Sequence, residues 1–199
     1  NSWDFWVYPD QLDMPDSDDV VVASELTPEV RQGLSQGRKV LLILHDKIKG
    51  EKGGDVQVGF SPIFWNTMWT GNQAPHTMGI LCEPKHPLFN DFPTEYYSNW
   101  QWWDIVTGAQ VMNMEDFPAQ IDPLIQSIPD YHKNRKLAFA FEGNVGEGKL
   151  LVTSIDFTKN LEENLASRQL YYSMLNYMES EQFAPANNIS LKNIEKLTN

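Results

Sequence analysis

The chain has 199 residues, and its 27 acidic and 15 basic side chains give a formal net charge of -12 at pH 7. This charge argues against a nucleic-acid partner, because phosphate binding requires clustered cations. Apolar residues make up 41% of the chain and charged residues 21%, so the chain can bury a core. A single cysteine excludes an internal disulfide framework and a cysteine-based zinc site.

The first segment combines a strand pattern with an acidic stretch. Apolar Trp3, Phe5 and Val7 alternate with the residues between them, which is the period of a β-strand. We interpret residues 1–9 as a strand left over from a preceding β-sandwich domain. Residues 10–19 follow as an acidic linker, because Asp and Pro dominate them.

Residues 20–44 have the pattern of a strand, a short helix and a second strand. The apolar run of residues 20–23 is typical of a strand that is covered on both faces. Thr27, Pro28 and Glu29 form a helix start, and Gly37 supplies the stop. A second apolar run covers residues 39–44. Two strands joined by a helix favour a right-handed crossover and a parallel sheet.

The middle of the chain is rich in aromatic residues and proline, and it gives only a short strand at residues 77–82 and a helix at 94–103, capped by Thr94. Residues 136–142 and 148–155 are predicted strands, joined as a hairpin by a glycine-rich turn. A helix begins near Asn164, and a short terminal helix covers residues 190–197. We therefore predict an α/β domain at residues 20–185, with a mostly parallel sheet flanked by helices, a C-terminal β-hairpin and helix, and a tail at 186–199.

Candidate catalytic residues are few. Cys82 follows a strand, but Ile80 and Pro84 occupy the positions where a nucleophile elbow needs small residues, which favours a buried apolar role. His45 ends a parallel strand, where α/β folds place ligands, although a loop hydrogen bond is the simpler interpretation. His86 lies between two prolines, which stiffen its backbone.

Acidic residues in aromatic surroundings include Glu83 and Asp104, and paired carboxylates could serve sugar hydrolysis if two of them face each other. Structural hydrogen bonding is the alternative. The histidines lack metal-ligand spacing, so we expect neither a metal nor a cofactor.

The 7 tryptophans are the most unusual feature of the composition. Exposed indoles stack on sugars or anchor protein partners, whereas buried ones only build a core. In the run Trp100, Trp102 and Trp103, neighbouring side chains point in different directions, so at least one of them should face away from the core. Trp65 and Trp69 are further candidates for a surface contact.

Several longer strings resemble the C-terminal region of glycoside hydrolase family 2 proteins of the β-galactosidase type. They are Phe64-Trp65-Asn66-Thr67-Met68-Trp69, Pro75-His76-Thr77-Met78-Gly79-Ile80-Leu81-Cys82, Pro84-Lys85-His86-Pro87-Leu88-Phe89, Phe92-Pro93-Thr94-Glu95-Tyr96 and Asn99-Trp100-Gln101-Trp102-Trp103-Asp104. The α/β pattern is similar to flavodoxin-like, class I glutamine-amidotransferase-like domains that are appended to several glycosidases.

The resemblance implies a non-catalytic accessory domain of a carbohydrate-degrading enzyme, which serves domain packing, oligomerisation or walling of the substrate cleft. No catalytic glutamate of the family has a counterpart here. The implied partners are other domains of the parent glycosidase, carbohydrate or a second copy. Nucleic acid is disfavoured by the net charge, and a membrane by the lack of any run of roughly 18 to 20 apolar residues. The implied location is periplasmic or secreted. Two alternatives stay open: a carbohydrate-binding module that uses surface tryptophans, and a domain that contributes residues such as His45, His86, Glu83 or Asp104 to hydrolysis.

Overall fold

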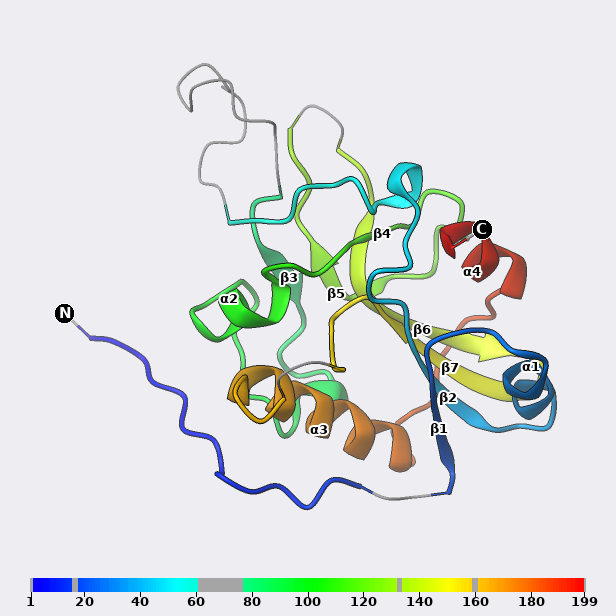
Figure 1. Ribbon diagram of the computed structural model, residues 1–199, viewed down its shortest axis with the longest axis horizontal. Coiled ribbons are helices and arrows are strands. Elements are labelled where there is room, and N and C mark those ends of the chain that lie inside the picture. The colour runs from blue at the N-terminus through cyan, green and yellow to red at the C-terminus, as the bar shows by residue number, and fades with distance from the viewer. Residues whose placement is uncertain (1, 16–17, 61–76, 132–133, 159–160, 199) are drawn as a thin grey trace.

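The computed structural model describes residues 2–15, 18–60, 77–131, 134–158 and 161–198 (Figure 1). Its strands are β1 (Val20–Ala23), β2 (Lys39–Ile43), β3 (Ile80–Cys82), β4 (Met112–Asn113), β5 (Pro123–Ser127), β6 (Leu137–Val145) and β7 (Gly148–Thr153). Its helices are α1 (Pro28–Ser35), α2 (Gln101–Val106), α3 (Leu165–Glu179) and α4 (Leu191–Thr198), with short 3-10 turns η1 (Gly50–Lys52) and η2 (Pro87–Phe89).

The strands form one mixed sheet in the order β1-β2-β7-β6-β5-β3, and β4 pairs with β6. Only the pairs β1–β2 and β2–β7 are parallel. The other four pairings are antiparallel. The prediction of a mostly parallel, flavodoxin-like sheet is therefore wrong.

The physical reason for this error is the path of the chain. The crossover β1–α1–β2 is parallel, as its pattern predicts. After β2 the chain crosses to the opposite edge of the sheet and returns through β5 and β6, which pair antiparallel. β5 was not predicted, because a short segment that begins with Pro123 carries little strand signal.

Helices cover both faces of the sheet. In β2, Val40 and Leu42 belong to the core under α1 and α4, whereas Leu41 and Ile43 belong to the core under α2, α3 and η2. Both sets are buried. Since neighbouring side chains on a strand point to opposite faces, a continuous apolar run is what a strand between two cores requires.

Most local predictions are confirmed. Thr27 caps α1 by accepting a hydrogen bond from the backbone N–H of Val30, and Asn164 caps α3 in the same way. β6 and β7 form the expected hairpin, and α4 is the short terminal helix. The prediction of a helix at residues 94–103 is wrong, because α2 begins only at Gln101.

Residues 2–9, here called the arm, have no assigned helix or strand. Figure 1 shows this segment in blue, running outward past α2 and α3 to the N-terminal end of the drawn chain. Its inner end is fastened by Tyr8, whose ring stacks on Phe92 at 6.3 Å and whose hydroxyl bonds the Oε1 atom of Gln101. The arm is thus held at its base, beside α2.

Candidate functional site

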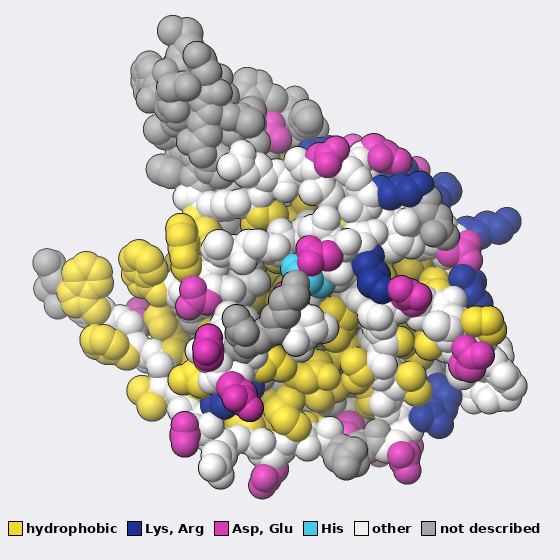
Figure 2. Space-filling view, viewed as in Figure 1, with side chains coloured by type: hydrophobic (Ala, Val, Ile, Leu, Met, Phe, Trp, Pro, Cys, Tyr) yellow, Lys and Arg dark blue, Asp and Glu magenta, His cyan; other side chains and the backbone are white. Residues whose placement is uncertain are grey.

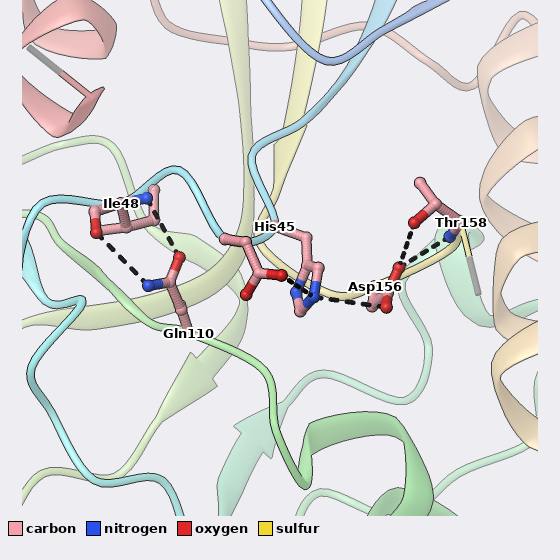
Figure 3. A network of polar contacts seen from close by, with 6 residues as sticks. His45, Ile48, Gln110, Asp156 and Thr158 are labelled. Atoms are coloured by element: carbon pink, nitrogen blue, oxygen red, sulfur yellow. Dashed lines mark hydrogen bonds and ion pairs between the residues drawn. The ribbon is translucent and has the colours of Figure 1, made fainter.

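A polar cluster lies where β2 and β7 end. Because these strands are parallel neighbours, their carboxyl ends meet at one edge of the sheet, and the residues that follow them come together. The Nε2 atom of His45 lies 3.3 Å from Oδ2 of Asp156 and 3.1 Å from Oδ2 of Asp46. Figure 3 shows the His45 ring facing Asp156 across this edge.

Nearby hydrogen bonds hold this cluster in place. Oδ1 of Asp156 accepts from the backbone N–H and the hydroxyl of Thr158, at 2.8 and 2.7 Å. On the other side, the side-chain amide of Gln110 bonds both backbone polar groups of Ile48, at 3.1 and 3.4 Å (Figure 3). Asp46 has a φ of 58°, which is a left-handed conformation and is uncommon for a non-glycine residue.

The chemistry open to His45 is limited by burial. Its side chain is only 11% exposed, and its Nδ1 atom is buried without a hydrogen-bond partner among the described residues. Nε2 is the ring nitrogen that meets the two carboxylates, and Nδ1 is the one that remains. Because Nδ1 does not reach solvent, this ring ties the β2 and β7 loops together and is poorly placed as a general base.

His86 lies on a different part of the fold, and no contact joins it to His45 within the described chain. Its Nδ1 atom accepts a hydrogen bond from the backbone N–H of Leu88 at 3.3 Å and so caps η2. Its ring meets Tyr177 edge-on at 5.2 Å. Burial lowers the pKa of His86, which favours the neutral ring that this cap requires.

Cys82 is buried, and its thiol donates a hydrogen bond to the backbone carbonyl of Glu95 at 3.3 Å. Burial raises the pKa of Cys82 to about 12. The thiol therefore stays protonated at neutral pH, which agrees with a packing role and argues against a nucleophile.

The tryptophan run has divided roles. Trp102 is fully buried, packs edge-on against Phe92 at 5.3 Å and donates from Nε1 to the hydroxyl of Thr94 at 2.8 Å. Trp100 is 76% exposed, and Trp103, which stacks on Phe60 at 5.4 Å, is 49% exposed. The expectation that at least one of the three faces away from the core is confirmed.

The remaining predicted residues are dispersed. Asp104 is exposed on α2, and its backbone carbonyl accepts from the amide of Asn164 at 3.1 Å. No contact within the described ranges brings Asp104 to His45 or His86. Trp65 and Trp69 lie outside the described residues. Glu83 lies close to His86, whose backbone N–H donates to the Glu83 carbonyl at 2.9 Å. The structure does not assemble the predicted acids and both histidines into one site.

A second feature is an exposed aromatic face beside α2. Figure 2 shows apolar side chains gathered at the left of the view, over the arm and the α2 region of Figure 1. We define the aromatic face by its exposed large apolar residues, Trp3, Phe5, Val7, Tyr96, Tyr97, Trp100 and Trp103. Sequence reasoning placed Tyr96 and Tyr97 within the predicted helix at residues 94–103 and did not single them out, because tyrosine is intermediate between the buried and the exposed residue types.

A hollow of about 510 Å³ lies between α1 and α4, next to the ends of β1 and β2. Its charged lining is paired internally: Arg31 with Glu195 at 2.7 Å and Lys47 with Glu25 at 2.6 Å. These half-exposed pairs leave no charge in the hollow that calls for an ionic ligand.

No three His, Cys, Asp or Glu side chains among the described residues are arranged to hold a metal ion. None of the helices in the described ranges is long and apolar enough to span a membrane.

The family comparison gives one match. The family model described as "Domain of unknown function (DUF8487)" matches residues 21–199. No curated protein matches the chain. This match and the mixed sheet overturn the resemblance to glycoside hydrolase family 2 and to flavodoxin-like amidotransferase domains.

Proposed function

We propose that this chain, which belongs to the family described as "Domain of unknown function (DUF8487)", is a non-catalytic docking domain that packs on another protein domain through its aromatic face. The observation that carries the proposal is the exposure of large apolar side chains on the arm and on the segment from Tyr96 through α2, the region where Figure 2 shows apolar side chains at the left of the view. Soluble proteins rarely expose apolar patches of this kind unless they bind something.

Burial of Trp100 against a partner would contribute a large part of the binding free energy. Its exposed part measures on the order of 150 Å², and burying that area contributes roughly 3–4 kcal/mol at about 25 cal/mol per Å². Tryptophan and tyrosine are also the residue types enriched at the energetic centres of protein interfaces. Several such side chains together are sufficient to offset the free-energy cost of association and give a stable complex.

The buried chemistry of the domain supports a non-catalytic role. The raised pKa of Cys82 and the burial of the Nδ1 atom of His45 argue against the two groups considered as a possible nucleophile and base, in line with the structural roles that their sequence context favours. Both act in packing and loop positioning.

Hydroxyl-radical footprinting tests the proposal by comparing the isolated chain with the protein purified from its source under native conditions. We expect Trp100 and Tyr97 to react readily in the isolated chain and at least fivefold more slowly in the native protein. Tyr131, which is exposed outside the aromatic face, is the internal control. Equal reactivity of Trp100 in both samples would refute the proposal.

A carbohydrate-binding module is the competing function, because Trp100 and Trp103 present exposed indole rings. Calorimetric titration of the chain with galactosides and plant glycans separates the two. We expect no binding heat. Glycan binding that is abolished by Trp100→Ala would instead assign the aromatic face to sugars.

A further inference from the structure

The arm has the side-chain pattern of a β-strand without a sheet. Trp3, Phe5 and Val7 are 75%, 86% and 91% exposed, and Trp6 and Tyr8, between and after them, are partly buried. Over residues 5–8 the side chains therefore alternate between outward and partly buried positions, whereas Asp4 is exposed like Trp3. A period of two is the spacing with which an extended strand divides its side chains between two faces.

The backbone of the arm is available for pairing. Within the described part of the chain, no backbone hydrogen bond joins residues 2–7 to another segment, and no bridge is assigned there. The fastening begins at Tyr8 and continues at Pro9, whose carbonyl accepts from the guanidinium of Arg168 at 2.6 Å. Residues 2–7, which span roughly 20 Å at about 3.3 Å per residue when extended, thus make no backbone pairing within the described chain.

From these observations, and resting on the proposed docking function, we infer that residues 2–8 add as a β-strand to the open edge of a sheet in another protein domain, with Trp3, Phe5 and Val7 entering the apolar layer of that sheet. Strand addition satisfies the backbone groups that are unpaired here, and it buries alternate side chains.

Charge indicates what kind of edge fits. Asp4 lies within the arm, Asp10 follows it, and the whole chain carries a net charge of -12. Natural sheet edges are commonly protected by lysine, which complements an acidic strand. A second copy of this chain is disfavoured, because it would bring two strongly acidic surfaces together. Of the two edge strands of this chain's own sheet, β3 is bridged from Leu81 to Tyr97, and β1 pairs only with β2 among the described residues.

Hydrogen exchange of the arm amides tests the inference directly. In the isolated chain, amides 3–7 should exchange at the rates of an unstructured peptide. In the protein purified from its source, at least two of these amides should be protected 100-fold or more. Unprotected amides in the native protein would overturn the inference. Sedimentation of the native protein at twice the mass of its own polypeptide, with a protected arm, would overturn the choice of partner in favour of a second copy.

Proline substitution separates strand pairing from side-chain docking. Successive N–H groups on a strand point to opposite edges, so one of the variants Asp4→Pro and Phe5→Pro must remove a paired donor. Asp4→Ala and Phe5→Ala are the matched controls, since each removes the same side chain and retains the N–H group. In the native protein, we expect the arm amides of one proline variant to show tenfold less protection from exchange than those of its matched alanine control. If both pairs behave alike while Trp100 stays protected in footprinting, the arm docks without pairing, and only the strand inference fails.

Discussion

Removing the buried indole of Trp102 should destabilise the domain far more than removing the exposed indole of Trp100, two residues earlier. Trp102 is fully buried, contacts Phe89 and Phe92 edge-on and donates to the hydroxyl of Thr94. Truncation of a core tryptophan to alanine costs about 3–5 kcal/mol, out of a typical total stability of about 5–15 kcal/mol. At roughly 2–4 °C per kcal/mol for a chain of this size, the midpoint temperature should fall by about 6–20 °C.

Urea unfolding followed by far-ultraviolet circular dichroism measures both variants without relying on tryptophan fluorescence. Trp100→Ala should change the free energy of unfolding by less than about 0.5 kcal/mol, as exposed substitutions usually do. Trp102→Phe should fall between the two, because it retains an aromatic ring and loses the hydrogen bond to Thr94. Equal losses for Trp100→Ala and Trp102→Ala would contradict the division of roles within the tryptophan run.

Three further predictions concern other parts of the fold. Gly148→Ala should lower the free energy of unfolding in urea by about 1–3 kcal/mol, because the new Cβ atom would lie 2.4 Å from the backbone carbonyl oxygen of Leu34. Gly33→Ala on α1 should instead raise it by up to about 1 kcal/mol, because the nearest atom to the new Cβ, Cγ of Arg38, is 3.5 Å away. Burial lowers the pKa of His86 below its ordinary value of 6.5, so the unfolded state binds a proton more readily than the folded state. The free energy of unfolding should therefore fall as the pH drops below 6.5. His86→Asn retains a capping acceptor without a titrating ring, so it should make this fall with pH less steep. Iodoacetamide at pH 8 should alkylate native Cys82 at least about 100-fold more slowly than the urea-unfolded chain, whereas similar rates would show that the thiol is accessible.

His45 in the polar cluster stands at a position typical of catalytic residues, but it has a structural role. His45 follows a parallel strand, and it does meet a carboxylate from the neighbouring strand end, Asp156. The ring nitrogen that would act on a substrate is the buried one. The geometry therefore stabilises two loops at the edge of the sheet. Such a distinction depends on the orientation of one ring, which no sequence pattern records.

The local elements of this protein are determined by short-range chemistry. Thr27 and Asn164 cap their helices, the glycines around residue 146 turn the β6–β7 hairpin, and the apolar run of β2 requires burial on both faces. Each of these depends on side chains within a few positions, so the sequence alone predicts them.

The tertiary structure decided the rest. The direction of each strand depends on where the chain goes between strands, so the antiparallel half of the sheet followed from the long connection after β2 and not from any local pattern. Which aromatic rings are buried was also a matter of packing: Trp102 and Trp100 have the same side chain and nearly the same neighbours in sequence, yet one fills the core and the other faces solvent. Burial is a property of surfaces that meet in space, and a sequence pattern determines only which side chains are able to meet.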